Sequence, residues 1–584
     1  MNIPTTRPKA RAWHIANTTV RNPLRLKGGL EALVVSGFEG NMSKSQEERI
    51  AETLHDFGVI TLAETTTDIT SIARKWRSVL VQLGFLWPDV EMRPKIRDVK
   101  QSEIGAPFTL TPNGRRLLAA QSVQGEQEVL LRSLAALRLP SPLEQDYNFA
   151  SFSPLKHVID ILEKLEEIGA EPYISRLEMS SIVILTNGQD DLDSIASEIC
   201  DLRRLRAASN AKRKFDVQFI RGVAEYKGFK HETLYDYQDV SFRYLKATGL
   251  FQSRGRGITF VPEKRKTARL LADIPETQLD AIEYLNRIAQ GLELPTDSLY
   301  GAKEVLSDLL LIASDRAIAF DSSNYDLSSP GGVSLARHDL EQLIFEAKEV
   351  QYAGDQVNQI NEILAYLQML DENRTTQQFG EDQLLIPKEE RPAYFEWLLW
   401  RVLLALDCLV VPPNKVRRFD IDQDFLPVGT APGGGPDVIA EYSDSVLVVE
   451  VTLTENSRQE AAEGEPVRRH VADVLEQFEP LGKTVYGLFI ARRIDTNTAE
   501  TFRIGVWYKR NDERVSLNVV PLTLGQLREI LRIGVKNRKL KPALLIDVIL
   551  QASTARLDTT GAPEWKARIA EIVGVPASTS ASVT

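Results

Sequence analysis

The chain has 584 residues, of which 43% are hydrophobic and 26% charged, and its formal net charge is −11. This length exceeds what one hydrophobic core supports, and the composition excludes a fibrous or disordered protein. The longest apolar stretch, WLLWRVLLALDCLVVPP, is interrupted by Arg401 and Asp407, so we expect no membrane span. The chain has only two cysteines and no apolar run after its basic N-terminal residues, so we expect a cytoplasmic protein without a disulfide scaffold or zinc cluster.

Charge is unevenly distributed along the sequence. Residues 1–30 contain six Lys or Arg and no acid, and residues 201–270 contain seventeen basic against seven acidic residues. Residues 271–400 reverse this balance, with eight basic against twenty-four acidic residues. The asymmetry favours a basic first half that faces nucleic-acid phosphates, while the acidic middle stays away from them. Local variation without a partner is the alternative interpretation.

Two stretches of the first half, residues 71–120 and 240–274, contain predicted elements in the same order. Each has a helix, a Gly-apolar-apolar triplet, a short β segment that ends at a proline, and the start of a basic helix. A helix followed by a β-hairpin is typical of a winged helix. In SRGRG, Gly255 and Gly257 can adopt positive φ at the hairpin tip. We therefore predict a DNA-recognition region with winged-helix-like subdomains over residues 1–274, with an ordinary mixed segment as the alternative.

The remaining chain divides into a helical and an alternating part. Residues 275–385 carry apolar side chains at helical spacing together with many acids, which predicts a helical acidic linker. In residues 386–584, predicted strands alternate with helices, which indicates an α/β domain with a central sheet. The predicted strands are PDVIAEY, SVLVVEVTLT, TVYGLFIARRI, FRIGVWYK and LNVVPLTL. The expected fold class is thus a multidomain α+β protein.

Two acids accompany the first two of these strands. Asp437 begins one strand, and Glu450 lies in the middle of the apolar run VLVVEVT. An ionised carboxylate inside a strand costs several kcal/mol unless something compensates for its charge. Mg²⁺ is a natural compensator because it binds one or two carboxylates together with phosphate oxygens and waters. We therefore expect Asp437 and Glu450 to share a Mg²⁺ ion if their strands are neighbours.

The spacing of these acids has the form of a restriction-nuclease site of the PD-(D/E)xK type. In that motif a lysine, which orients the attacking water, stands two residues after the second acid, but this chain has Thr452 there. The motif alone is therefore a weak signal. Further polar residues lie nearby in the sequence, namely Glu396 in YFEWLLW and Glu465 and His470 in GEPVRRHV.

The order FEWLLW, PD strand, VVEVT and EPVRRH resembles the catalytic half of the AlwI family of type IIS restriction endonucleases, which includes site-specific nicking endonucleases. SPLKHVIDILEKLEEIG, FRYLKATGLFQSRG and WHIANTTVRNP resemble the first half of that family. The resemblance implies Mg²⁺-dependent hydrolysis of double-stranded DNA at a fixed offset from a short asymmetric site, such as GGATC or GAGTC. It also implies winged-helix-like recognition subdomains, a helical linker and a restriction-nuclease-like domain.

The resemblance further implies functional residues and partners. Asp437 and Glu450 would bind the metal, and Glu396, Glu465 and His470 fall on further active-site positions of the family. The family also lacks the motif lysine. Second-strand cleavage would need a transient homodimer or a small catalytic subunit, whereas a chain that fails to pair would nick, and a cognate methyltransferase would accompany the enzyme.

Several roles stay open at this point. Either Glu465 or His470 can position or deprotonate the attacking water, because histidine suits proton transfer near neutral pH. Arg115 and Arg116 in NGRRLL, and Arg254 and Arg256 in SRGRG, are candidates for contacts to guanine edges or only to phosphates. Two other functions remain as alternatives: a non-catalytic winged-helix DNA-binding protein with a degenerate nuclease domain, and a nuclease for RNA or for particular DNA structures.

Overall fold

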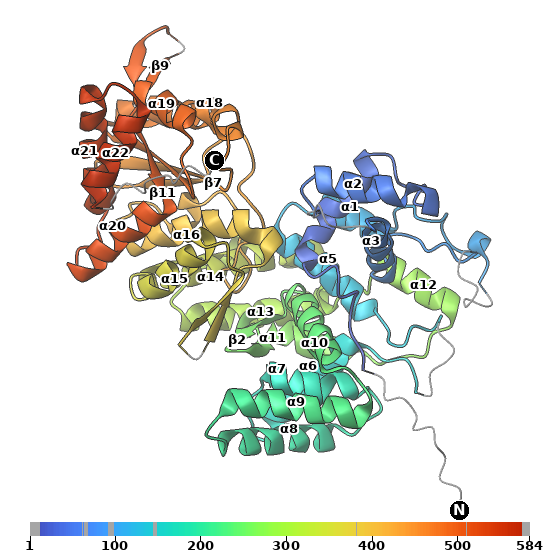
Figure 1. Ribbon diagram of the computed structural model, residues 1–584. Coiled ribbons are helices and arrows are strands. Elements are labelled where there is room, and N and C mark those ends of the chain that lie inside the picture. Colours follow the sequence, from blue (N-terminus) through green and yellow to red (C-terminus); the bar gives the residue numbers. More distant parts are fainter. Residues whose placement is uncertain are drawn as a thin grey trace, which may run out of the picture. The chain divides into compact units, whose positions relative to one another are not determined.

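The chain folds into two compact units, Met1–Gln342 and Leu343–Thr584, each with its own hydrophobic core (Figure 1). The computed structural model describes residues 12–60, 62, 68–91, 99–143, 149–380, 382–509 and 511–574. The basic N-terminal segment 1–11, part of the predicted DNA-recognition region, lies outside these residues. The predicted linker 275–385 is divided between the two units. Among the described residues, no helix is both long and apolar enough to cross a membrane.

The first unit is mainly helical. Its strands form one antiparallel sheet in the order β1-β3-β2. These strands are β1 (Ile174–Ser175), β2 (Phe251–Arg254) and β3 (Gly257–Phe260). The helices are α1 (Leu26–Val35), α2 (Glu47–Asp56), α3 (Thr70–Gln82), α4 (Pro112–Ala119), α5 (Val123–Ala136), α6 (Pro154–Glu167), α7 (Arg176–Ser181), α8 (Leu192–Ala207), α9 (Lys212–Lys227), α10 (His231–Lys246), α11 (Arg265–Ala272), α12 (Ala281–Gln290) and α13 (Leu299–Asp315), and α14 (Pro330–Asp355) continues into the second unit.

The later of the two similar stretches has the predicted order of helix, hairpin and helix, formed by α10, β2, β3 and α11. Gly255 and Arg256 form the turn, and Gly255 has a φ of +53°. Gly257, by contrast, lies inside β3 and does not have positive φ, so that expectation was wrong. A Cβ at Gly257 would lie 2.2 Å from the carbonyl oxygen of Ile174, so its missing side chain allows β1 to pair closely.

The earlier stretch has the same order in a reduced form. Helix α3 is followed by a single antiparallel bridge between Leu86 and Leu110, and then by α4. The hydroxyl of Thr111 accepts a hydrogen bond from the backbone N–H of Gly114 and so caps α4, with Pro112 at the first helical position. The sequence pattern thus predicted the element order in both stretches. Their assignment as winged helices remains a prediction.

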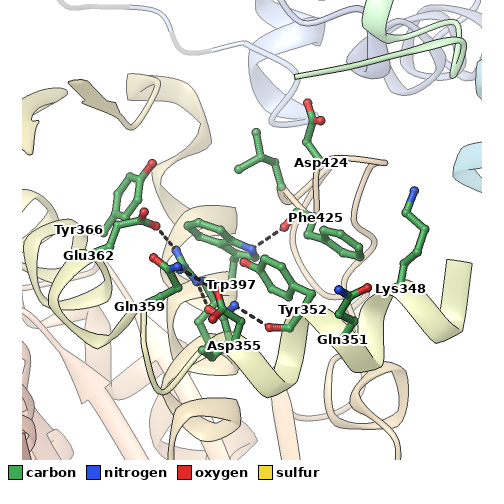
Figure 2. A pocket seen from close by; sticks show the side chains of 13 residues that line it. Lys348, Gln351, Tyr352, Asp355, Gln359, Glu362, Tyr366, Trp397, Asp424 and Phe425 are labelled. Carbon is green, nitrogen blue, oxygen red and sulfur yellow. Dashed lines mark hydrogen bonds and ion pairs between the residues drawn. The ribbon is translucent and has the colours of Figure 1, made fainter. Parts of the chain in front are cut away.

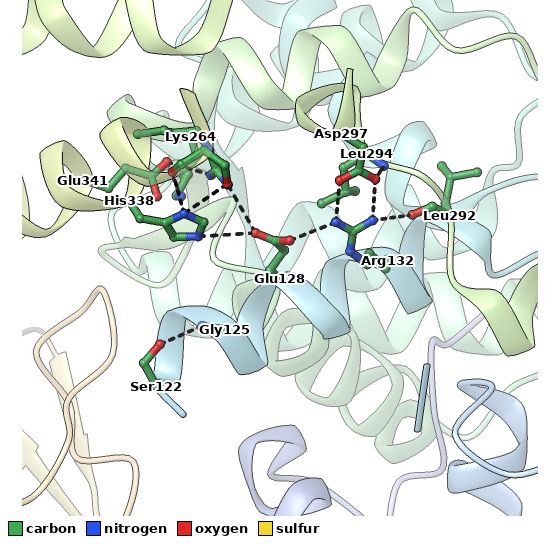
Figure 3. A network of polar contacts seen from close by, with 12 residues as sticks. Ser122, Gly125, Glu128, Arg132, Lys264, Leu292, Leu294, Asp297, His338 and Glu341 are labelled. Carbon is green, nitrogen blue, oxygen red and sulfur yellow. Dashed lines mark hydrogen bonds and ion pairs between the residues drawn. The ribbon is translucent and has the colours of Figure 1, made fainter. Parts of the chain in front are cut away.

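Some of the acidic charge after residue 271 is neutralised within the first unit (Figure 3). Arg132 on α5 makes a two-pronged ion pair with Asp297, at 2.6 and 2.7 Å. Lys264 pairs with Glu341 on α14 at 2.8 Å. A further pair joins Lys266 to Glu304 at 2.8 Å. Part of the basic charge of the first half therefore stabilises the fold and is not available for phosphates.

The second unit is built around a four-stranded sheet in the order β11-β8-β7-β6, with β6 antiparallel to β7 and the other pairs parallel. Its strands are β6 (Val438–Glu441), β7 (Ser445–Thr452), β8 (Thr484–Ala491) and β11 (Val519–Thr523), and two hairpins add β4 (Thr376–Phe379) with β5 (Asp382–Leu385) and β9 (Val506–Tyr508) with β10 (Arg514–Ser516). The helices are α15 (Ile360–Asp371), α16 (Arg391–Ala405), α17 (Pro413–Val416), α18 (Glu465–Phe478), α19 (Thr496–Ile504), α20 (Leu524–Lys536), α21 (Ala543–Ala555) and α22 (Ala562–Val573).

The predicted strands of this region are present with one exception. The stretch FRIGVWYK, residues 502–509, was expected to be a strand, but its first three residues complete α19. Gly505 ends that helix in the left-handed conformation, with φ of +57°, and only Val506–Tyr508 is extended. The glycine therefore divides one apolar run between two kinds of element.

Candidate active site

Asp437 and Glu450 lie directly opposite each other on neighbouring chain segments. β6 and β7 are antiparallel, with Val438 paired to Val449, and the next pair in this register is Asp437 with Glu450. Opposed residues of an antiparallel pair project from the same face of the sheet. The backbone N–H of Val451 also donates to Asp437 Oδ2 at 2.8 Å, which fixes the aspartate at the strand edge. The two predicted metal ligands therefore share one face.

Glu450 is held by His470, which projects from α18. His470 Nδ1 lies 2.6 Å from Glu450 Oε1, and both residues are more than 90% buried. When Glu450 is ionised, Nδ1 carries the proton and donates it, which leaves Nε2 as the accepting nitrogen. His470 Nε2 is buried and has no hydrogen-bond partner within the described part of the chain. A base with a defined tautomer thus stands beside the two acids.

A third acid, Glu396, enters the cluster from α16. This helix is buried along nearly its whole length, and Glu396 itself is 6% exposed. Its Oε2 accepts a hydrogen bond of 2.6 Å from the backbone N–H of Ala431, in the loop that leads to Asp437. Burial raises the pKa of Glu396 to about 7, and the charge of Glu450 adds to this effect, while Ala431 and Arg418 oppose it.

Glu463 is a fourth acid of the cluster, and sequence reasoning missed it. Burial raises its pKa, and the negative charge of Glu450 acts in the same direction, while the hydroxyl of Thr452 donates to it and the nearby His470 lowers the pKa. Burial also raises the pKa of Asp437 well above its usual range, and the charges of Glu450 and Glu396 raise it further. The four carboxyls therefore crowd negative charge into a small, poorly hydrated space.

Glu465, in contrast, does not join this cluster. Its side chain is 56% exposed and accepts a hydrogen bond of 3.1 Å from Arg469 Nε, one turn along α18. Glu465 and His470 do not share a helix face, because five residues correspond to a rotation of about 140° around an α-helix. Glu463 instead lies close enough to Glu450 and His470 for both to act on its pKa. It lies in a π-helical turn, Glu460–Gly464, whose phase the sequence pattern does not indicate.

The two arginines between Glu465 and His470 are engaged elsewhere. Arg468 Nε donates to the carbonyl of Gly464 at 3.0 Å, and its guanidinium lies 5.8 Å from the centroid of the Trp507 ring. Arg469 is paired with Glu465. Both arginines thus have structural partners close by.

The chain matches the AlwI restriction endonuclease family over residues 81–530, a range that includes every acid of this cluster and His470. This protein belongs to the AlwI restriction endonuclease family. Its membership supports a DNA endonuclease function. The absence of the motif lysine at Thr452 therefore does not separate this chain from the family.

Comparisons with individual proteins add little to the family assignment. A comparison with curated proteins finds no match. Among solved structures, the small subunit R.BspD6I2 of the heterodimeric restriction endonuclease R.BspD6I is 23% identical, with 36% of this chain and 97% of that chain covered and a TM-score of 0.28. The BpuJ1 endonuclease binding domain, in complex with pyrene- and phenanthrene-modified DNA, is 8% identical (42% and 85% covered, TM-score 0.26). Restriction endonuclease FokI is 12% identical (92% and 99% covered, TM-score 0.25).

The donor set of this AlwI-family protein fits a divalent cation of the magnesium type. Among the described residues, no group of three or more His, Cys, Asp and Glu is arranged to hold a metal ion by itself. Magnesium usually takes one or two protein carboxylates and completes its shell with waters and phosphate oxygens. Asp437 and Glu450 supply such a pair of oxygen donors, and their crowded negative charge favours a cation.

The predicted DNA-reading arginines all lie in the first unit. Arg115 and Arg116 are exposed on α4, and Arg116 donates to the carbonyl of Gln290. Arg254, at the end of β2, is about half exposed and forms an ion pair with Glu171. Exposure makes contacts to DNA possible for Arg115 and Arg116, and their roles stay predictions.

A separate cavity of about 600 Å³ lies in the second unit, lined by residues of α14, α15, α16 and the hairpin 420–428 (Figure 2). Its buried Arg401 donates to Gln356 at 2.6 Å and to Glu362 at 2.8 Å, and the guanidinium lies 4.7 Å from the Trp397 ring. Trp397 Nε1 donates to the carbonyl of Phe425. These side chains hydrogen-bond to one another, and the bond from Trp397 fixes the hairpin 420–428. This hairpin precedes the loop that leads to Asp437.

Proposed function

We propose that this AlwI-family protein is a metal-dependent, sequence-specific endonuclease of type IIS, which hydrolyses double-stranded DNA at a fixed offset from a short asymmetric site. The observation that carries the proposal is the register of β6 and β7. It places Asp437 opposite Glu450, with Glu396, Glu463 and His470 around them. Burying several carboxylates together costs free energy unless a bound cation compensates for their charge. Clusters of this kind therefore occur most often at functional sites.

In the proposed mechanism Asp437 and Glu450 would hold a Mg²⁺ ion, which when bound would polarise the scissile phosphate and acidify water. His470 Nε2 would accept the proton of the attacking water while Nδ1 donates to Glu450. Glu396 and Glu463 would orient water beside the pair. These carboxyls and the histidine would replace the motif lysine.

We further propose that the DNA-reading function belongs to the first unit. The α10–β2–β3–α11 order and its reduced counterpart at α3 and α4 support winged-helix-like subdomains, with residues 1–274 as the recognition region. Arg115, Arg116 and Arg256 are the proposed DNA contacts, together with Arg254 if it leaves Glu171. The family resemblance favours GGATC or GAGTC as the target, and a cognate methyltransferase would protect that site in the cell.

Because the described part of the chain has one such cluster, one chain would break one strand at a time. A double-strand cut would need a second catalytic centre from a transient homodimer or a small subunit, and a chain that acts alone would nick. Comparison of nicked and linear products as the protein concentration rises separates these modes. A homodimer gives linear DNA with a second-order dependence on protein, whereas nicks at all concentrations indicate a missing partner.

The proposal is tested by digestion of plasmid DNA with and without Mg²⁺, followed by mapping of the ends on each strand. We expect ends at one fixed offset from a single asymmetric motif, and only when the divalent ion is present. Binding without cleavage by the wild type would support the non-catalytic DNA-binding alternative. Cuts independent of sequence, or cuts in RNA alone, would contradict the type IIS assignment.

A further inference from the structure

Arg418 approaches the loop that carries Asp437 from a neighbouring chain segment. It follows α17, where Arg417 forms an isolated antiparallel bridge with Val438. In that register Arg418 and Asp437 are the next pair, so Arg418, Asp437 and Glu450 occupy successive segments at one end of the sheet. Arg418 Nη1 donates a hydrogen bond of 2.9 Å to the carbonyl oxygen of Pro436, the residue before Asp437.

Gly435, the residue before Pro436, has no side chain that would obstruct this contact. A Cβ at Gly435 would lie 2.6 Å from Nη1 and 2.9 Å from Cζ of Arg418, which is closer than non-bonded atoms approach. Gly433, two residues earlier, has nothing within 4 Å of the same position. A side chain at residue 435 would therefore force the guanidinium to move from its present position. The requirement is specific to that glycine and not to the whole GGG run.

Arg418 is also a cation beside the acid cluster. Its charge stabilises the ionised form of Glu396, whose pKa is otherwise raised by burial and by the charge of Glu450. In the motif of this site type the cation is the lysine, and that position holds Thr452 here. Arg418 thus brings positive charge and a fixed donor to the loop from a different part of the chain.

We propose that Arg418 is a positioning residue of the active site, which fixes Asp437 for divalent-ion binding by holding the carbonyl of Pro436. This inference rests on the proposed function of the same site. A guanidinium suits the task because its planar fork can hold a carbonyl while its charge faces carboxylates. Residues that support metal ligands in this way typically contribute about 10–100-fold to metal affinity or activity.

The neighbouring Arg417 provides a matched control. Its Nε and Nη2 pair with Glu349 at 2.8 and 3.1 Å, and its Nη1 donates to the carbonyl of Phe419. Arg417 is 12% exposed and Glu349 1%, so Arg417 is a largely buried structural arginine whose hydrogen bonds go to Glu349 and Phe419 rather than to Pro436. Substitution of Arg417 should therefore change stability and leave the active-site loop in place.

The test is a calorimetric titration of the full-length protein with Mn²⁺ as a probe for the divalent ion, combined with cleavage rates under single-turnover conditions. For Arg418→Gln we expect Mn²⁺ affinity to fall about tenfold or more and cleavage to fall in parallel, while DNA affinity without divalent ion is unchanged. Arg418→Lys should restore part of the loss. Arg417→Lys should lower the melting temperature and leave Mn²⁺ affinity as in the wild type.

A second pair of variants leaves Arg418 unchanged and tests the same contact if Arg418→Gln does not fold. Gly435→Ala should push the guanidinium away and reproduce the loss of Mn²⁺ affinity, whereas Gly433→Ala should behave as the wild type. Wild-type Mn²⁺ affinity in Arg418→Gln or in Gly435→Ala would overturn the inference. Equal losses in Gly435→Ala and Gly433→Ala would also overturn it. If the wild type binds Mn²⁺ in the expected manner but cuts no DNA, the proposed function fails and the role of Arg418 is still decided by the titration.

Discussion

Glu396→Gln is expected to make the second unit more stable at alkaline pH while it impairs cleavage. The pKa of Glu396 is raised from 4.5 to about 7, chiefly by burial. Because one pKa unit corresponds to about 1.4 kcal/mol, ionisation of this carboxyl destabilises the folded state by about 3 kcal/mol at pH 8. Glutamine keeps a neutral acceptor for the N–H of Ala431, and the effect of this hydrogen bond on the carboxylate is already part of the pKa of about 7. The expected gain is thus about 3 kcal/mol at pH 8.

The sign of the effect depends on pH. Below about pH 4.5 the carboxyl is protonated in both the folded and the unfolded chain, so the wild type carries no penalty there. The penalty grows as the pH rises from about 4.5 to 7, since the unfolded chain releases the proton and the folded chain retains it. It is constant above that range. The advantage of Glu396→Gln should accordingly be near zero below about pH 4, small at pH 5 and complete at pH 8.

Hydrogen exchange of peptides from α16, measured without divalent ions, reports this local stability. Glu465→Gln is a suitable control, because Glu465 is an exposed acid of the same unit and should give no pH-dependent gain. If Glu396→Gln is less stable than the wild type at pH 8, burial of the Glu396 charge does not destabilise the folded state. An equal gain in stability at pH 5 and pH 8 would lead to the same conclusion.

Four further outcomes are expected. Asp437→Asn should abolish cleavage while DNA affinity stays at the wild-type value, as measured by gel shift beside plasmid digestion. Glu463→Gln should slow cleavage by about 10–100-fold, whereas Glu465→Gln should stay within about twofold of the wild type in the same rate assay. His470→Asn should reduce the cleavage rate by about 10²–10⁴-fold and flatten its pH profile. Arg115→Gln should lower the slope of log K against log salt by about 0.9 for cognate and random duplexes alike, and a loss confined to the cognate site would indicate a base contact instead.

The sequence predicted those parts of the site that depend on strand register. An acid in the middle of VLVVEVT and another at the start of PDVIAEY meet if the strands pair in antiparallel register, and the structure has this pairing. Glu396 and His470 lie on α16 and α18, two helices that pack against β7, and His470 reaches Glu450. Regular elements have fixed periods, so residue spacing carries over into space.

The sequence did not predict features that depart from the regular spacing of helices and strands. Glu465 was chosen on the family resemblance and on its nearness to His470 in the sequence, whereas Glu463, in the π-helical turn Glu460–Gly464, was missed. Arg418 reaches the site through a loop of irregular backbone, for which spacing gives no information. The charge asymmetry of the chain also has an internal component, since acids such as Asp297 and Glu341 pair with arginine and lysine of the same unit.

We expect Asp437 and Glu450 together to hold a divalent ion at the scissile phosphate. An anomalous difference map from crystals of the full-length protein with cognate DNA and Mn²⁺ tests this. A manganese peak should lie between these two carboxylates and next to a DNA phosphate, and it should disappear in Asp437→Asn. A peak bound by other side chains, in crystals whose enzyme still cleaves DNA, would contradict it.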